Sequence, residues 1–251
     1  MDHALAALHR VADALAARLS AVTDWAMSGK RDGQYLADVA TDEVAVGMLL
    51  DAGFGVLSEE SGLAAAERDR IVVIDPLDGS TNASRGIPWF ATALCVVDDG
   101  GPVAALVVNQ ASGRRLEAAR GEGAWSGRRR LQPSGRESLE GAVIGVSGRP
   151  TGEWGWWQYR ALGAASLDLG LVATGGLDGY VDLDVDAHGV WDYLAATLIC
   201  TEAGAVVADA YGRDLAVLDH AARRTPVAAA SPTLLEALLE GRARADNIET
   251  S

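Results

Sequence analysis

The sequence is poor in cysteine and in lysine. Cys95 and Cys200 are its only cysteines, and both stand in apolar runs, which indicates buried free thiols. Lys30 is the only lysine, and the net charge of the chain is −14. Such an acidic chain is unsuited to bind nucleic acid or an anionic membrane, because both require a basic face. A small phosphorylated substrate is still compatible with this charge, provided that a cation lies in the site.

Long apolar runs are also missing. No segment approaches the roughly 20 apolar residues that cross a bilayer. The N-terminal residues lack the basic start and the apolar run of a secretory signal. We therefore expect a cytoplasmic protein without a membrane partner.

The chain does contain enough apolar sequence for a sizeable core. Hydrophobic residues make up 49% of its 251 residues and charged residues 22%, which is typical of a globular protein. This length allows one large domain or two closely packed ones. We treat residues 1–251 as a single unit, with sub-domains of about 1–140 and 141–251 as the alternative.

Apolar periodicity predicts a mixture of helices and strands. An apolar stripe over 5–22 predicts a first helix, and Thr41 or Asp42 is the expected N-cap of a second helix that closes at Gly53. Further helices are expected over 164–176, over 191–204 and after Ser231, and strands over 54–58, 71–74, 91–97, 102–108 and 142–147. Because these elements come in blocks, we expect an α+β fold rather than a strict βαβ series.

Two aspartates follow the second of these expected strands. In the stretch IVVIDPLDGSTN, Asp75 and Asp78 come after the strand, and Pro76 fixes the backbone between them. Two carboxylates held this close must share either a proton or a cation. Oxygen ligands suit Mg²⁺ or Mn²⁺ rather than zinc. The backbone N–H groups from Gly79 onward can bind an anion, so the stretch predicts a metal and a phosphate side by side.

Taken alone, this stretch is more typical of a loop, because Asp, Pro and Gly are common turn residues. Two further acidic groups change that balance. Glu59 and Glu60 follow another apolar run, and Asp192 opens a predicted helix. Each has a simple structural explanation by itself, as a solvated loop acid or as a first-turn residue stabilised by the helix dipole. Their occurrence together in one chain favours a metal site.

Four short motifs resemble the inositol monophosphatase family, and they come in the order found in that family. They are LSEESG (57–62), IDPLDGSTN (74–82), LVATGGLDGY (171–180) and WDYLAATLICTEAGA (191–205). The second and fourth are similar to the two signatures of the family, the first to its acidic loop, and the third to the segment before the second signature. The resemblance runs from about residue 40 to about residue 209.

This resemblance implies a fold and a cofactor. The family has a layered α-β-α-β-α fold of the sugar-phosphatase type, and it hydrolyses phosphomonoesters with two or three Mg²⁺ ions, for which Mn²⁺ can substitute. Its metal ligands correspond here to Glu59, Asp75, Asp78 and Asp192 and to the backbone carbonyl of Leu77. A homodimer is the usual form of the family, and we expect one here on that basis.

The resemblance also assigns residues to hydrolysis by a metal-activated water. Ser80 stands at the hydroxyl position of the family, and Asp42 stands at the aspartate that hydrogen-bonds this hydroxyl. Together with Glu59 they are expected to orient the water, while the backbone amides of Gly79 and Ser80 hold the phosphate. No covalent intermediate is needed. The aspartyl-nucleophile phosphatases fit less well, because they require two aspartates separated by one residue, and here two residues separate them.

The alcohol half of the substrate is expected at Asp78, Ala165, Asp182 and Asp192. The segment before Asp192 is longer than is usual in the family, so Asp184 and Asp186 compete with Asp182 for one role. His188, just before the second signature, is a candidate for the rim of the site.

Two segments depart from the family pattern. The spacing of the loop before Asp42 is irregular, which leaves open whether Lys30, Arg31 or Asp38 reaches the site. The segment 154–159 contains three tryptophans and a tyrosine. We interpret it as a packed or dimer-burying patch, with a wall of the substrate site as the second interpretation.

The expected substrate is a small polyol, sugar or amino-alcohol monophosphate, such as inositol monophosphate. Histidinol phosphate, a 3′-phosphonucleotide and fructose 1,6-bisphosphate are the alternatives, and the lack of an evident basic cluster weakens the bisphosphate. The alternative of another class is a non-catalytic relative that binds metal and phosphate for regulation. The complete set of metal-binding acids argues against it.

Overall fold

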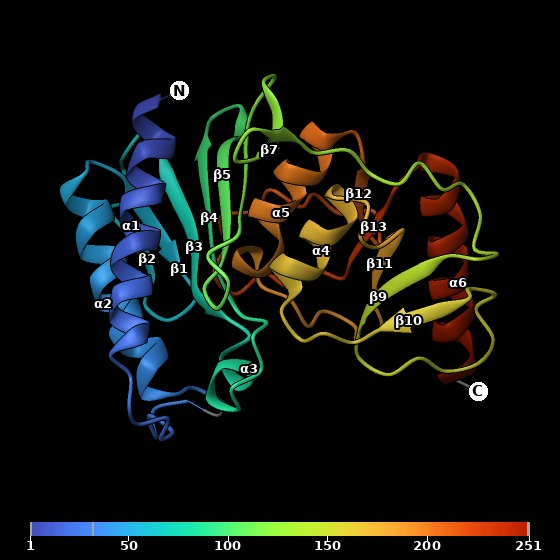
Figure 1. Cartoon of the computed structure of the whole chain (residues 1–251), viewed down its shortest axis with the longest axis horizontal. Coiled ribbons are helices and arrows are strands. Elements are labelled where there is room, and N and C mark those ends of the chain that lie inside the picture. The colour runs from blue at the N-terminus through green and yellow to red at the C-terminus, as the bar shows by residue number, and fades with distance from the viewer. Residues whose placement is uncertain (1, 32, 250–251) are drawn as a thin grey trace.

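The computed structural model describes residues 2–31 and 33–249, which form five layers in the order α-β-α-β-α (Figure 1). The outer layers are α1 (Asp2–Ser20) with α2 (Leu36–Asp51) at one end and α6 (Pro232–Glu249) at the other. Two sheets come next, and α4 (Ala165–Ala173) and α5 (Val190–Ala203) lie between them. The layered fold expected from the sequence is confirmed.

The first sheet contains eight of the described strands in the order β2-β1-β3-β4-β5-β6-β7-β8. They are β1 (Gly55–Ser58), β2 (Gly62–Ala64), β3 (Ile71–Asp78), β4 (Ala91–Asp98), β5 (Gly101–Asn109), β6 (Arg115–Ala119), β7 (Gly123–Ser126) and β8 (Arg129–Arg130). β1 and β3 pair in parallel and the other neighbours are antiparallel. The parallel pair brings the ends of β1 and β3 to one edge of the sheet, and the candidate site lies there.

The second sheet contains five described strands in the order β10-β9-β11-β13-β12. They are β9 (Val143–Ser147), β10 (Gln158–Arg160), β11 (Gly179–Asp182), β12 (Val206–Asp209) and β13 (Pro226–Ala229). The chain passes from one sheet to the other between β8 and β9. One apolar cluster joins the two sheets through α4 and α5.

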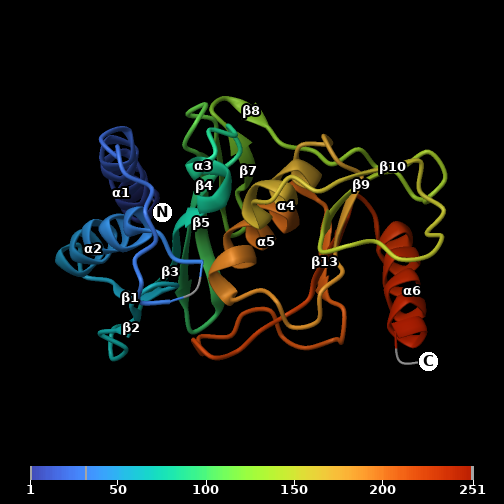
Figure 2. The same cartoon turned by 90° about the horizontal axis from the view of Figure 1, so that it is seen from below.

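The central strands are apolar throughout because both of their faces are covered. On β3, Val72 and Ile74 pack in the cluster of α1 and α2, while Ile71 and Val73 pack in the cluster of α4 and α5. Figure 2 shows helices on both sides of this sheet. Cys95 and Cys200 are buried free thiols, as the sequence predicts.

The expected start of the second helix is wrong. Thr41 and Asp42 lie inside α2, which begins at Leu36 with Tyr35 as its N-cap. The early start is stabilised by Asp38, whose Oδ2 accepts a hydrogen bond from the backbone N–H of Tyr35 at 2.7 Å. Because tyrosine is not a usual N-cap residue, the sequence pattern predicts the N-cap at Thr41 or Asp42 instead.

The other expected helices are confirmed, and α5 ends at Gly204 in a left-handed conformation. Among the described residues, no helix is long and apolar enough to cross a membrane.

In the segment 154–159, Trp154 packs against Gly241 of α6 and stacks on Trp156 with ring centroids 4.7 Å apart. This part of the segment is core packing at the outer face of the second sheet. Trp157 and Tyr159 are exposed.

Candidate active site

Asp75 and Asp78 lie within β3, not after it as the sequence suggested. Opposite β4, the register shifts between the pairs Asp75–Ala93 and Asp78–Ala91, so β3 holds one extra residue there. Such a bulge re-aims side chains at the end of a strand and also tolerates a proline, here Pro76. Both acids are buried.

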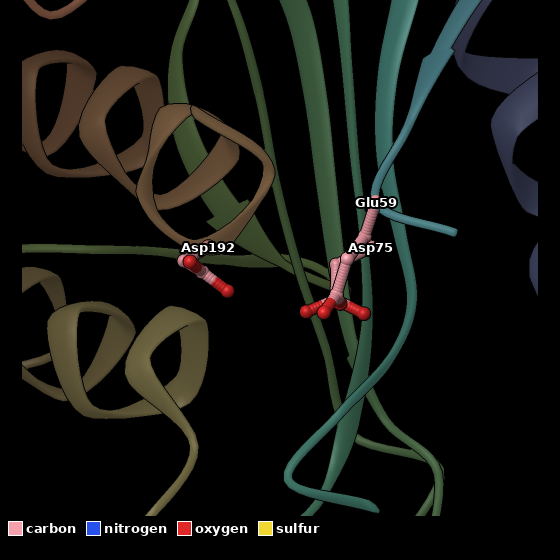
Figure 3. A group of neighbouring side chains, drawn as sticks. All are labelled: Glu59, Asp75 and Asp192. Carbon is pink, nitrogen blue, oxygen red and sulfur yellow. The ribbon is translucent and has the colours of Figure 1, made fainter. Parts of the chain in front are cut away.

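Three carboxylates from different elements converge at this bulge (Figure 3). One oxygen atom each of Glu59, Asp75 and Asp192 lies within 4.8 Å of the other two. Glu59 follows β1, Asp75 belongs to β3, and Asp192 occupies the first turn of α5. The cluster therefore depends on the parallel pairing of β1 with β3 and on the contact of α5 with the first sheet.

Local hydrogen bonds orient these carboxylates. Asp75 Oδ1 accepts the N–H of Leu77 at 2.9 Å, and Asp192 Oδ2 accepts the N–H of Gly189 at 2.7 Å. Each aspartate thus keeps its second oxygen atom for the cluster. A set of carboxylate oxygens at this spacing fits a hard divalent cation such as Mg²⁺ or Mn²⁺.

The protonation of the cluster supports the same conclusion. Burial, followed by the charges of Asp192 and Glu60, raises the pKa of Glu59 to about 8. Burial and the neighbouring acids raise the pKa of Asp75 well above its ordinary value. Burial also raises the pKa of Asp192, although His188 and Arg223 oppose this shift. The three carboxylic acids cannot all be ionised at neutral pH unless a cation lies between them and offsets their charges.

Asp78 lies beside this group but has its own partner. Its Oδ2 accepts hydrogen bonds from the backbone N–H of Ser166 at 2.8 Å and from the hydroxyl of Ser166 at 2.5 Å. Burial raises its pKa to about 6, against the opposing effect of these hydrogen bonds. The predicted role of Asp78 as a metal ligand stays a prediction.

Gly79 turns the chain from β3 into the short helix α3 (Ser80–Ser84). Its φ of 81° is in the left-handed region, and a Cβ there would lie 3.1 Å from the Cβ of Ala164 and from the carbonyl oxygens of Trp89 and Gly163. The turn therefore requires glycine. The first N–H groups of α3 have no carbonyl of a preceding turn to bind.

A cavity of about 380 Å³ opens in front of the acidic cluster. Residues that line it include Asp38, Glu59, Glu60, Leu77, Ser80 and Asp192, with Arg31 and Arg223. Arg31 Nη2 lies 3.2 Å from Glu59 Oε1 and 2.9 Å from Glu60 Oε2. Arg31 and Asp38 thus reach the site, whereas Lys30 lines a neighbouring hollow.

Asp38 and Asp42 stand one helical turn apart in α2, but their side chains have different surroundings. Asp42, which the resemblance assigned to the Ser80 hydroxyl, accepts a hydrogen bond from the hydroxyl of Ser58 instead. In the part of the chain that is described, no hydrogen bond joins Asp42 to Ser80. Asp38 lines the cavity, and its buried Oδ1 has no hydrogen-bond partner among the described residues. Burial raises the pKa of Asp38 to about 7.

A second, smaller cavity of about 180 Å³ lies on the other side of Asp192. Asp78, Ala165, Asp168, Tyr180 and His188 are among the residues that line it. Asp168 accepts a hydrogen bond from the indole of Trp89 at 2.7 Å, and burial raises its pKa to about 7. This cavity has polar walls and room for a small polar group.

Asp182 lies behind this cavity rather than in its wall. Its side chain is fully buried, and its Oδ2 lies 2.6 Å from Nδ1 of His188. Burial alone would lower the pKa of His188, but the hydrogen bond to Asp182 and the charges of Asp192 and Asp78 raise it to about 9. His188 therefore lines this cavity with Asp182 bonded behind it, and the predicted contact of Asp182 with the substrate stays a prediction. Of the two competitors, Asp186 pairs with Arg213, and the carboxylate of Asp184 adjoins Gly148.

The sequence gives only weak signs for several residues of the site. Ser166 and Asp168 lie in the predicted helix 164–176, and their polarity in an apolar segment was the available sign. Asp38 follows Tyr35 at the spacing of a capping interaction, which could have indicated the true start of α2. Arg223 carries no local pattern, because only the fold brings it to the cavity.

The chain resembles known proteins over nearly its whole length. The model of the inositol monophosphatase family matches residues 3–246. Fructose-1,6-bisphosphatase of Pyrococcus furiosus is 32% identical over 224 residues, which cover 85% of each chain. Inositol-1-monophosphatase of Mesorhizobium japonicum is 34% identical over 205 residues, which cover 74% of this chain and 76% of that protein.

A solved structure agrees with these relatives. The extragenic suppressor protein SuhB of Bartonella henselae superposes with a TM-score of 0.81 at 27% identity. The match covers 95% of this chain and 98% of that one.

Proposed function

The chain belongs to the inositol monophosphatase family, and we propose that it hydrolyses a small phosphomonoester with the help of Mg²⁺. The observation that carries this proposal is the convergence of Glu59, Asp75 and Asp192 within 4.8 Å, beside a cavity that Ser80 also lines. Relatives named as phosphatases support the reaction class.

The residues that would hold the cation are Glu59, Asp75 and Asp192, with the backbone carbonyl of Leu77 and, for a further ion, Asp78. When bound, the cation supplies a Lewis acid that polarises the phosphate and lowers the pKa of a water molecule. The bulge in β3 and the first turn of α5 hold the carboxylates in place before the cation arrives. Mn²⁺ fits the same oxygen ligands.

Ser80 and Asp38 orient the attacking water in this proposal. Asp38 takes the role that the sequence assigned to Asp42, because its free Oδ1 belongs to a cavity-lining side chain, while Asp42 is engaged by Ser58. Glu59 accepts the proton of the water. The backbone amides of Gly79 and Ser80 hold the phosphate at the start of α3.

The second cavity would receive the alcohol half of the ester. The small side chain of Ala165 leaves space for the alcohol, and the carboxylate of Asp168 and the imidazole of His188 can form hydrogen bonds with its hydroxyl groups. Asp182 orients His188 from behind. A cavity of about 180 Å³ suits a small polyol or amino alcohol, so a monophosphate of inositol type is our first choice.

Two other functions follow from the relatives. A sugar bisphosphate is the alternative substrate, because a relative is named fructose-1,6-bisphosphatase. A regulatory role without turnover is the alternative of another class, and the SuhB neighbour motivates it. We retain the homodimer as a prediction on the basis of the family alone.

Phosphate release with and without Mg²⁺ across a panel of esters tests the proposal. The panel contains inositol 1-phosphate, histidinol phosphate, fructose 1,6-bisphosphate and a 3′-phosphonucleotide, with Asp78→Asn as the inactive control. Mg²⁺-dependent release from one ester, lost in the control, is the expected result. A folded protein that binds Mg²⁺ and releases phosphate from none of them would support the regulatory alternative.

A further inference from the structure

Arg223 is a cavity-lining cation that the proposed reaction does not yet use. It belongs to the loop between β12 and β13, and it lines the larger cavity together with Glu59, Ser80 and Asp192. The loop is fixed beside the site, because the backbones of Arg224 and His188 form two hydrogen bonds, of 2.9 and 3.2 Å. Arg223 is therefore placed by the fold rather than by chance on a free surface.

The guanidinium group of Arg223 is held in one orientation. It lies over the ring of Trp191, 5.1 Å from the centroid, at a distance typical of a cation–π contact. Its Nη1 donates to the backbone carbonyl oxygens of His220 and Ala222 at 2.8 and 2.9 Å. In the described part of the chain, Nε and Nη2 have no hydrogen-bond partner.

The two arginines of this cavity differ in their partners. Arg31 forms ion pairs with Glu59 and Glu60, which offset its charge. Arg223 forms no ion pair with any residue among 2–31 and 33–249, although it is half-buried and near Asp192. An oriented, half-buried guanidinium with free N–H groups is well suited to bind an oxyanion.

The charge of the site creates the need for such a group. A phosphate dianion must enter a cavity lined by four carboxylates, from Asp38, Glu59, Glu60 and Asp192, in a chain with a net charge of −14. Cations in the acidic cluster offset only the side of the phosphate that faces them. A fixed positive charge in the wall formed by Trp191 offsets the repulsion from another side.

We propose that Arg223 is a binding residue for the phosphate group of the substrate, with Nε and Nη2 donating to its non-bridging oxygens. This inference rests on the proposed function, since it assigns a further contact in the same site. Trp191 and the carbonyls of His220 and Ala222 position the guanidinium for this contact. Inorganic phosphate, the product of the reaction, binds to the same N–H groups.

Calorimetric binding of inorganic phosphate in the presence of saturating Mg²⁺ tests this contact without turnover. The variants are Arg223→Met, which keeps an apolar side chain over Trp191, Arg223→Gln and Arg223→Lys. Loss of hydrogen bonds to a charged group weakens binding roughly 10- to 100-fold, so we expect this change in Kd for Arg223→Met and a smaller change for Arg223→Lys. Mg²⁺ binding without phosphate is measured in each variant, so that phosphate affinity is compared at saturating Mg²⁺ in every protein.

Arg224→Met is the matched control. Arg224 is the next residue of the same loop, but its guanidinium donates to the backbone carbonyls of Asp214 and Arg223 and lies outside the residues that line the cavity. The control should bind phosphate within about twofold of the unmodified protein. Equal losses in Arg224→Met and Arg223→Met would overturn the proposal, because the shape of the loop would then explain both.

Further outcomes separate this inference from the proposed function. Unchanged phosphate affinity in Arg223→Met and Arg223→Gln, with an unchanged Tm, would overturn the inference and leave the phosphatase proposal intact. Phosphate binding that depends on Arg223, in a protein that hydrolyses no ester, would support the inference and contradict the phosphatase. If Arg223→Met does not fold, the remaining proteins test the inference: phosphate affinity should fall from the unmodified protein to Arg223→Lys and again to Arg223→Gln.

Discussion

Nε2 of His220 lies 3.0 Å from the backbone carbonyl oxygen of Glu59, although 161 residues separate the two. The imidazole also lies against Trp191, with ring centroids 4.8 Å apart. In Figure 2 the orange-red chain between α5 and β13 runs back beneath α5 toward the first sheet. His220 belongs to this part of the chain, between β12 and β13. A proposed metal ligand on the first sheet is thus held by a loop of the second.

Replacement of His220 by alanine should weaken Mg²⁺ binding. One hydrogen bond of this kind contributes about 0.5–1.5 kcal/mol, which corresponds to a roughly 2- to 10-fold higher Kd. Isothermal titration calorimetry measures this change. His220→Gln keeps a donor and should recover part of the affinity, and His3→Ala, at an exposed position, should have no effect. Unchanged affinity in His220→Ala would show that Glu59 needs no support from this loop.

Binding of Mg²⁺ should release protons near neutral pH. The pKa of Glu59 is raised to about 8 and that of Asp75 is also raised, so the metal-free cluster retains protons at pH 7. Because the cation requires ionised carboxylates, its affinity should fall as the pH drops below about 8. Calorimetry in buffers of different ionisation enthalpy gives the number of protons released. Heats that are independent of the buffer at pH 7 would contradict the raised pKa values.

Asp38 and Asp42 should differ in their effect on catalysis. Asp38→Asn removes the carboxylate that we assign to the attacking water, so kcat should fall roughly 100-fold or more. Asp42→Asn keeps an acceptor for the Ser58 hydroxyl, so kcat should stay within about tenfold. Steady-state kinetics on the best ester compares the two. The opposite ranking would restore the role that the family resemblance gave to Asp42.

The pair of Asp182 and His188 should control the charge in the second cavity. Asp182→Asn removes the charge that raises the pKa of His188, so this pKa should fall below about 9. The chain has four histidines, which makes a titration by NMR practical. A His188 that titrates identically in Asp182→Asn would contradict this coupling.

We also expect His188→Asn to raise KM more than it lowers kcat, because His188 lines the cavity assigned to the alcohol.

The sequence predicts those parts of the fold that depend on local patterns. Apolar runs with turn residues between them mark β3, β4 and β5, and Gly204 marks the end of α5. It does not predict the bulge in β3, because the extra residue is defined only against β4. The sequence does not predict the start of α2 either, because Tyr35 is not a usual N-cap residue and the capping hydrogen bond is accepted by Asp38.

The acids of the site are also predictable from local sequence patterns. Glu59 directly follows β1, Asp192 lies in the first turn of α5, and Asp75 comes directly after the apolar run 71–74 within β3, so short sequence motifs mark all three. The groups beside them are not predictable. Only the packing of a distant loop brings His220 to the backbone carbonyl of Glu59 and Arg223 to the wall of the cavity. Burial of Asp182 behind His188 is likewise a property of the folded chain.

The most direct test of the central claim compares Mg²⁺ binding with Mg²⁺ activation in the same protein. The claim is that Glu59, Asp75 and Asp192 hold the cation that hydrolysis requires. We predict that phosphate release from the best ester of the panel rises with Mg²⁺ at the concentration where calorimetry shows binding, and that Asp75→Asn abolishes both. Hydrolysis that proceeds without a divalent cation, or that survives in Asp75→Asn, would contradict the account.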